Sequence, residues 1–144
     1  MDYLIRPAEQ KDADPIYRII CELQECNLTR FVFEKIFKEN IENPHFIYFV
    51  AEAGNNFIGF ISCHTQCLLH RGGRVAEIQE LFIHPLYRGF RIGQKLIEDL
   101  EKKALFMNCI SLEATAELNQ KHTLLFYEKN AFIFTQKKCV KQLG

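Results

Sequence analysis

The chain has 144 residues, enough for one domain but not for two, and 48% of them are hydrophobic, with thirteen Phe and no Trp. Eighteen Lys and Arg balance eighteen Asp and Glu, so the formal net charge is zero. A surface that binds nucleic acid or an anionic membrane needs a clear basic excess, which argues against both partners. We therefore expect one globular domain over residues 1–144, with no nucleic-acid partner and no membrane association.

The six cysteines include no CxxC pair, and no histidine cluster accompanies them at zinc-ligand spacing. Residues 1–7 carry no apolar signal region, and no apolar run approaches the ~18 residues of a membrane span. We expect a cytoplasmic protein with reduced thiols and no bound metal. The composition leaves a homodimer open.

The spacing of apolar residues predicts alternating elements: a strand over 3–6, helices over 14–26 and 33–41, strands over 46–53, 57–64 and 75–84, a helix over 92–104, a strand over 110–114, a helix over 121–130 and a strand over 131–135. Asp14 and Pro15 are typical of an N-cap and a first helical position. Two early helices, then an antiparallel meander, then alternating strands and helices indicate the α/β class. More closely, they indicate an α+β mixed sheet that is mostly antiparallel and flanked by helices.

The most informative segment, His84 to Lys95, joins a strand to a helix. The first N–H groups of a helix have no internal partners and carry about +0.5 charge, so such junctions hold anions. Glycines at 89 and 93 let the backbone approach a ligand and accept unusual φ values. Residues 81–97 contain no Asp or Glu but three cations, Arg88, Arg91 and Lys95. The segment therefore predicts a phosphate site, with an ordinary solvated loop as the alternative.

The run from Arg88 to Gly93 resembles the R-x-x-G-x-G/A signature of the GNAT superfamily of N-acetyltransferases. Phe126 to Phe132 is similar to the F-Y-x-x-x-G-F segment of that family, and Ile5-Arg6-Pro7-Ala8 with Asp12 or Asp14 resembles its opening. The resemblance covers nearly the whole chain. It implies the GNAT fold, acetyl-CoA as co-substrate and transfer of the acetyl group to a primary amine.

The resemblance also implies how acetyl-CoA is held. The loop would bind its diphosphate, and Leu81 and Ile83 would offer backbone groups to its pantetheine arm. A backbone N–H near Leu81 or Phe82 would polarise the thioester carbonyl. The expected cofactor-binding residues are Leu81, Phe82, Ile83, Arg88, Gly89, Phe90, Arg91, Ile92, Gly93, Gln94, Asn119 and Tyr127.

Three positions depart from the family pattern. Arg91 stands where the signature has its central glycine, and Ala131 replaces the glycine before Phe132. Gln120 lies seven residues before the tyrosine, where the family places asparagine, and Asn119 is beside it. Because Arg91 still offers its N–H and adds a charge, we expect altered rather than lost diphosphate binding.

An alkylammonium with a pKa of about 10 must lose a proton before its nitrogen attacks a thioester, and a carboxylate can accept that proton. Regular alternation along the strand would put Glu77 and Glu80 on opposite faces. The resemblance places Glu77 toward the acetyl group, so Glu77 is the preferred base. Glu80 is the alternative, because a bulge would reverse the alternation after it. Tyr127 is the implied acid, or hydrogen-bond donor, for the departing thiolate.

Within the superfamily the sequence most resembles the aminoalkylphosphonate N-acetyltransferases, through Ile20 to Leu23, Glu77 to Leu81 and the polar residues His64, Gln66 and His70. The acceptor, a small-molecule amine, must bind between the first two helices and the segment before Val75.

Glu22 is the expected partner of the acceptor's ammonium, and His70 and Arg74 are the expected partners of a phosphonate or carboxylate. Two other classes stay open: a non-catalytic acyl-CoA-binding regulatory module, and an enzyme that acetylates protein amino groups. Glu77 together with Tyr127 favours an enzyme over the non-catalytic module, and a protein acceptor would require an open groove in place of a small polar pocket. The sequence does not separate an aminoalkylphosphonate from a polyamine, an aminoglycoside or an amino acid as acceptor.

Overall fold

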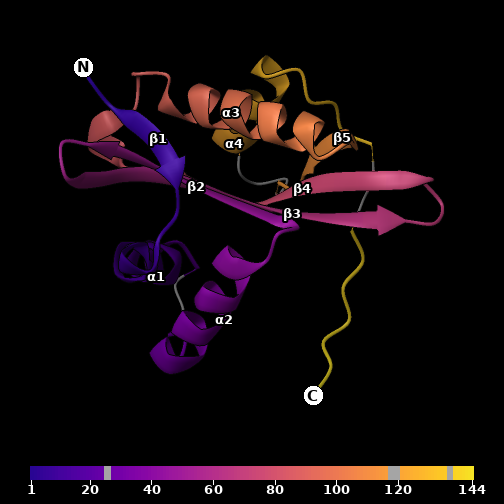
Figure 1. Cartoon of the computed structure of the whole chain (residues 1–144), viewed down its shortest axis with the longest axis horizontal. Helices are drawn as coiled ribbons and strands as arrows, with labels where there is room; N and C mark the ends of the chain where they lie inside the picture. The colour runs from indigo at the N-terminus through magenta and orange to yellow at the C-terminus, as the bar shows by residue number, and fades with distance from the viewer. Residues whose placement is uncertain (25–26, 117–120, 136–137) are drawn as a thin grey trace.

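A five-stranded sheet lies between two layers of helices (Figure 1). The computed structural model describes residues 1–24, 27–116, 121–135 and 138–144. The sheet order is β1 (Leu4–Pro7), β2 (Phe46–Ala53), β3 (Asn56–Leu68), β4 (Gly73–Ile83) and β5 (Cys109–Ala114). Neighbouring strands are antiparallel except β4 and β5, which are parallel. The mixed sheet expected from the sequence is confirmed.

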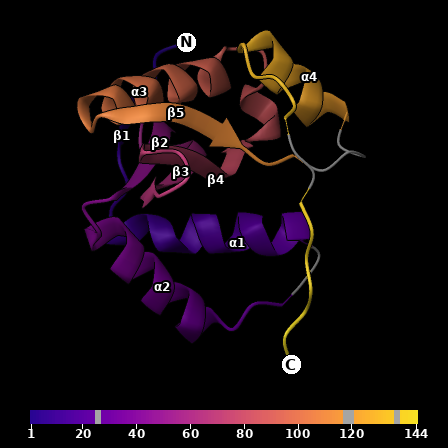
Figure 2. The ribbon, with the colours of Figure 1, turned by 90° about the vertical axis from the view of Figure 1, so that its right-hand side faces the viewer.

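The helices divide between the two faces of the sheet. On one face lie α1 (Ala13–Gln24) and α2 (Arg30–Glu42), and on the other α3 (Ile92–Phe106) and α4 (Lys121–Lys129), an arrangement that Figure 2 shows end-on. The stripe of α3 expected to face the core does so, since Ile92, Leu96, Leu100 and Ala104 are at most 4% exposed. Among the described residues, no helix is long and apolar enough to cross a membrane.

The first helix begins at Ala13, two residues before Pro15, the expected first helical residue. Asp12, rather than Asp14, caps the chain here, because its carboxylate accepts the Glu9 N–H at 2.7 Å in the short 3-10 turn before α1. Pro15 still lies in the first helical turn, where its missing N–H has no partner to lose. The start of α1 therefore differs from the expected one because the capping carboxylate is that of Asp12, in the 3-10 turn that precedes the helix.

The strand expected over 131–135 is wrong: the structure shows a turn at Ala131 and no strand from there to Thr135. Ala131 takes the left-handed conformation, with φ 68°, which glycine adopts most readily at the end of a helix. The Phe132 N–H then donates to the Tyr127 carbonyl at 3.0 Å, and the two rings pack with centroids 5.1 Å apart. The β-rich run thus ends α4 with a cap instead of joining the sheet.

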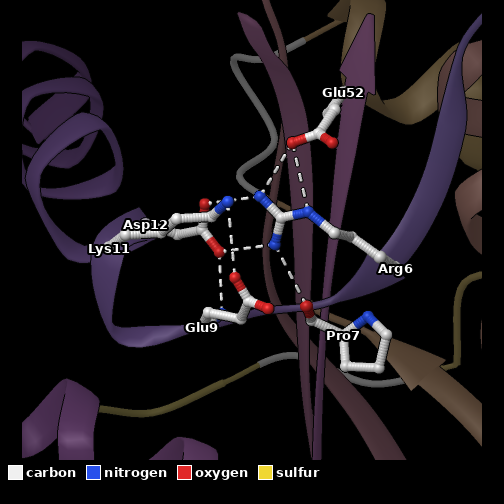
Figure 3. Close-up of polar contacts among 6 residues, drawn as sticks. All are labelled: Arg6, Pro7, Glu9, Lys11, Asp12 and Glu52. Carbon is white, nitrogen blue, oxygen red and sulfur yellow. Dashed lines mark hydrogen bonds and ion pairs between the residues drawn. The ribbon is translucent and has the colours of Figure 1, made fainter. Parts of the chain in front are cut away.

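Arg6 ties the edge of the sheet to the start of α1 (Figure 3). Its guanidinium donates two hydrogen bonds to the Asp12 carboxylate, at 2.8 and 2.9 Å, and two to the Glu52 carboxylate, at 3.2 and 3.0 Å. Asp12 is only 3% exposed, so this ion pair is largely shielded from water. The network fixes the position of α1 over the sheet.

We expect Arg6→Ala to lower the free energy of unfolding by about 3 kcal/mol, because it leaves the buried Asp12 carboxylate without its counter-charge. Urea unfolding at neutral pH measures this. Arg18→Ala is the matched control: it breaks the exposed ion pair of Arg18 with Asp14 and should cost less than about 1 kcal/mol. Equal, small changes in the two variants would show that the network does not hold α1.

Candidate active site

A bulge in β4 decides which carboxylates lie on the face of the sheet that α1 and α2 cover. Glu80 pairs with Ser62 and Ile78 pairs with Cys63, so Gln79 has no partner on β3. Cross-strand partners share a face, and the extra residue reverses the alternation. Glu77 and Glu80 therefore both point toward the side of α1 and α2. The expectation that they lie on opposite faces is wrong for this reason.

The second half of β4 has a free edge on the side of β5. The two strands pair only as far as Ile78 with Ala114, and from Glu80 to Ile83 β4 has a described partner on β3 alone. The His84 N–H donates to the Ile58 carbonyl at 2.8 Å, which sets the hydrogen-bond alternation of the antiparallel ladder. By that alternation the backbone groups of Leu81 and Ile83 point to the free edge, as an arm bound in sheet-like pairing requires.

Phe82 does not share that orientation. The same alternation turns its N–H and carbonyl toward Phe60 on β3, with which it pairs. Of the two N–H groups expected to polarise a thioester carbonyl, the one at Leu81 is therefore correctly oriented and the one at Phe82 is not.

The loop before α3 presents free N–H groups and positive charge together. Arg91 is the N-cap of α3 and has left-handed geometry, φ 60° and ψ 25°, so arginine here adopts the conformation that the family's glycine supplies. Gly89 has φ 91° and open space around its Cα. Arg88 and Arg91 are exposed, whereas the Lys95 ammonium is paired with Asp99 at 2.8 Å. Within the described part of the chain, Arg88 and Arg91 have no carboxylate partner, and Arg88 Nε donates to the Ile83 carbonyl at 3.4 Å. The residues present therefore fit a diphosphate.

Gly93 serves a different purpose from the one expected. It lies inside α3 without a positive φ, and a Cβ on it would come within 3.1 Å of the Phe126 ring. Its lack of a side chain therefore allows α4 to pack against the first turn of α3. The remaining expected loop residues, Phe90, Ile92 and Gln94, lie on this same loop and first turn, with Ile92 buried and the other two exposed.

We expect Arg91→Gly to preserve acetyl-CoA binding within severalfold, because glycine adopts the left-handed conformation freely and keeps the N–H. Arg91→Val should weaken binding more strongly and lower Tm, since a β-branched residue strains there. The shift in Tm on adding acetyl-CoA measures binding. An equal loss of that shift in both variants would assign the effect to the guanidinium charge instead of the backbone.

Tyr127 is buried in the core between the sheet and α3, and is 6% exposed. Burial raises the pKa of its hydroxyl to about 12. It belongs to the same cluster against which Leu81 and Ile83 pack. Asn119, the other expected contact from this region, lies outside the described residues.

A cavity of about 300 Å³ opens on the other face, between α1, α2 and strands β2 to β4. Seven of its twelve lining residues are aliphatic or phenylalanine. The polar lining residues are Asn40, Tyr48, His64, Gln79 and Glu80. Helix periodicity places the apolar faces of α1 and α2 here, and the bulge places Glu80 here.

Glu80 is the carboxylate of this cavity. Ser62, which is fully buried, donates its hydroxyl hydrogen to the carboxylate and accepts the Glu80 N–H at 3.0 Å. Burial raises the pKa of Glu80 above the ordinary carboxyl value, and the Ser62 hydrogen bond opposes this in part. Glu77 does not line the cavity, and its Oε1 accepts the Gln79 amide at 3.1 Å.

Tyr48 and His64 form the neutral polar part of the cavity wall. The Asn40 amide donates to the Tyr48 hydroxyl at 2.8 Å, and that hydroxyl lies 3.0 Å from His64 Nε2. The tyrosine hydroxyl can donate to Nε2 or accept from it, according to the histidine tautomer. Burial lowers the pKa of His64, which favours the neutral imidazole, and burial raises the pKa of Tyr48 to about 12.

The structure does not bring the expected acceptor residues to this cavity. Glu22 is exposed on α1, and His70 is exposed in the β3–β4 turn. Arg74 pairs with Cys67, which puts its side chain on the face of α3, where it donates to Thr65 Oγ1 at 3.0 Å. None of the three lines the cavity.

Sequence reasoning missed Tyr48 and Asn40 entirely and used His64 only as a mark of kinship. The sequence did contain one signal for this site. Ser62 and His64 are polar residues in the otherwise apolar run of β3, and their alternate positions put both on one face of the strand. Their partners from α2 and β2 could not be read from the sequence.

Comparison with known proteins agrees with this architecture. A family model described as the acetyltransferase (GNAT) family matches residues 13–132. The aminoalkylphosphonate N-acetyltransferase of Salmonella typhimurium is 30% identical over 128 residues, which cover 89% of this chain and 83% of that protein. A transcriptional regulator from Bacillus halodurans has the same fold, with a TM-score of 0.90, 19% identity and coverage of 99% of this chain and 100% of that one. Glucosamine-6-phosphate N-acetyltransferase from Arabidopsis thaliana follows, with a TM-score of 0.81, 19% identity and full coverage of both chains.

The family match over most of the chain, together with the 30% identical relative, defines the class of protein as an N-acetyltransferase that uses acetyl-CoA. The chain belongs to the GNAT family of acetyltransferases. The fold, the co-substrate and the enzyme class expected from the sequence are confirmed. The protein transfers an acetyl group from acetyl-CoA to an amine.

Proposed function

We propose that the acceptor is the primary amine of a small molecule that binds in the cavity between α1, α2 and the sheet, and that Glu80 accepts its proton. The observation that carries this proposal is a half-buried carboxylate, which the β4 bulge places in a cavity that holds no other formal charge among its described lining residues. Its raised pKa brings its proton affinity closer to neutral pH, where a general base works best. Glu77, three residues away on the same face, is the alternative base.

In this proposal, the residues that hold acetyl-CoA lie at the start of α3 and along the free edge of β4. The residue that accepts the proton lies in the cavity on the face of α1 and α2. Arg88, Arg91 and the first N–H groups of α3 would hold the diphosphate, and Leu81 and Ile83 the pantetheine arm. Acetyl-CoA supplies an activated acetyl group on sulfur. The ammonium gives one proton to Glu80, the free amine forms the C–N bond as the C–S bond breaks, and the second amine proton ends on the thiol. The products are the N-acetylated amine and free coenzyme A.

Tyr127 acts on the leaving thiolate as a hydrogen-bond donor in this proposal. A thiol has a pKa of about 8.5 and Tyr127 one of about 12, so full proton transfer from the phenol is uphill by about 5 kcal/mol. A hydrogen bond from the hydroxyl stabilises the thiolate without that transfer.

The cytoplasmic location and a homodimer stay predictions from the sequence.

An aminoalkylphosphonate is the acceptor that the name of the Salmonella relative suggests. Release of free thiol from acetyl-CoA, followed over a panel of small amines, tests the proposal. Turnover that depends on a small amine and saturates with it supports it. Acetylation of protein amino groups alone, or acetyl-CoA binding without any turnover, would contradict it and favour one of the two other classes.

A further inference from the structure

The acceptor cavity carries a charge pattern that selects among amines. Of its described lining residues, only Glu80 is an acid and none is Lys or Arg. Burial lowers the pKa of His64, so the imidazole adds no positive charge to the cavity at neutral pH. An ammonium is therefore the only charged group of an acceptor that this cavity complements.

Three arginines on the elements around the cavity have their partners outside it. Arg71 donates to the Glu113 carboxylate at 2.6 Å and to Ser111 at 3.1 Å, at the far end of the β3–β4 hairpin. Arg74 points to the opposite face. Arg30 is paired with Asp14 and Glu34 on the outside of α1 and α2. A phosphonate or carboxylate placed in the cavity would lose its hydration and meet the Glu80 charge without a counter-ion.

Most of the other lining residues are apolar and suit the hydrocarbon part of an acceptor. Ile16 and Phe60 are at most 2% exposed, and Phe33 and Phe37 stack with ring centroids 6.2 Å apart. A volume of about 300 Å³ holds about ten non-hydrogen atoms, if each takes about the 30 Å³ of a liquid water. Burying apolar surface of that size contributes strongly to binding.

We propose that the acceptor is a primary alkylamine or arylalkylamine without an acidic group, and not an aminoalkylphosphonate. This rests on the proposed function, because it concerns the substrate of the same site. Its ammonium lies at Glu80, and its alkyl or aromatic part fills the space between α1, α2 and the sheet.

Two matched sets of amines test this with saturating acetyl-CoA. We expect kcat/KM for n-pentylamine and 2-phenylethylamine to exceed that for 2-aminoethylphosphonate and 4-aminobutanoate by at least about 100-fold. From propylamine to pentylamine, each added CH2 should raise kcat/KM about fourfold. Equal or higher kcat/KM for the acidic amines would overturn this inference and leave the proposed function standing. No turnover in either set, with acetyl-CoA bound, would overturn both.

A change of specificity provides the second test. Ile36 lines the cavity yet is 51% exposed, so Ile36→Arg should fold and place a cation at the mouth. We expect the preference for 2-phenylethylamine over 2-aminoethylphosphonate to fall at least tenfold. Phe31→Arg, on the same helix but 77% exposed and outside the lining, should leave the preference unchanged. An unchanged preference in Ile36→Arg, or the same change in both variants, would show that the cavity does not select the acceptor.

Discussion

Glu80→Gln should lower kcat/KM for the amine by about 10²- to 10⁴-fold at neutral pH, the range that loss of a positioned proton acceptor produces. The amide keeps the shape of the side chain and can still accept the Ser62 hydrogen bond, so the loss isolates proton transfer. The rate of the variant should recover in part at high pH, where free amine is abundant. Steady-state rates from pH 6 to 10 measure both effects.

Glu77→Gln is the matched control, because the bulge puts this residue on the same face but outside the cavity lining. We expect a decrease of less than about tenfold and an unchanged pH dependence. A large, pH-dependent loss in Glu77→Gln together with a wild-type response of Glu80→Gln would return the role of base to Glu77, as the family resemblance implies.

The stability of the Glu80 variant separates catalysis from unfolding. Burial raises the folded-state pKa of Glu80, so the stabilising effect of its protonated form is lost as pH rises through that pKa. At neutral pH the ionised carboxylate therefore costs folding free energy that Gln does not. We expect Glu80→Gln to gain Tm relative to wild type as pH rises from 4 to 8. A variant that is inactive and less stable at pH 8 would point to a structural role.

Tyr127→Phe should lower kcat by about 10- to 1,000-fold with little change in acetyl-CoA affinity, because it removes one hydrogen-bond donor to the leaving sulfur. Since the pKa of Tyr127 is about 12, the phenol stays protonated from pH 6 to 10. The ratio of wild-type to variant kcat should therefore be constant across that range. The chemical step must limit kcat in this assay. A pre-steady-state burst of product would show that a later step limits kcat instead.

Two results would contradict this role. An unchanged kcat would mean that the hydroxyl serves only packing. A ratio that changes with pH near 8 would mean that Tyr127 ionises in the working range and transfers its proton fully. Phe126→Leu, next in sequence and packed on Gly93, should instead lower Tm and acetyl-CoA affinity together.

The sequence by itself determined the features that depend on local chemistry. The periodicity of α3, the missing acids from 81 to 97 and the glycine at 89 can each be read from residues close in the chain, which is why the helix and the position of the loop before it were predicted correctly. Anion binding at that loop stays a prediction. Arg91 was recognised as a departure, but its left-handed conformation is a property of the folded loop.

Only the tertiary structure decided which residues meet. Asp12 and Asp14 are equivalent in sequence, yet Asp12 pairs with Arg6 across the sheet edge while Asp14 pairs with Arg18 and Arg30. A bulge depends on the register with the neighbouring strand, so the side on which Glu80 lies could not be derived from alternation. The acceptor cavity joins α1, α2 and three strands separated by up to about sixty residues, and contacts over such distances are set by packing of the whole core rather than by any local pattern.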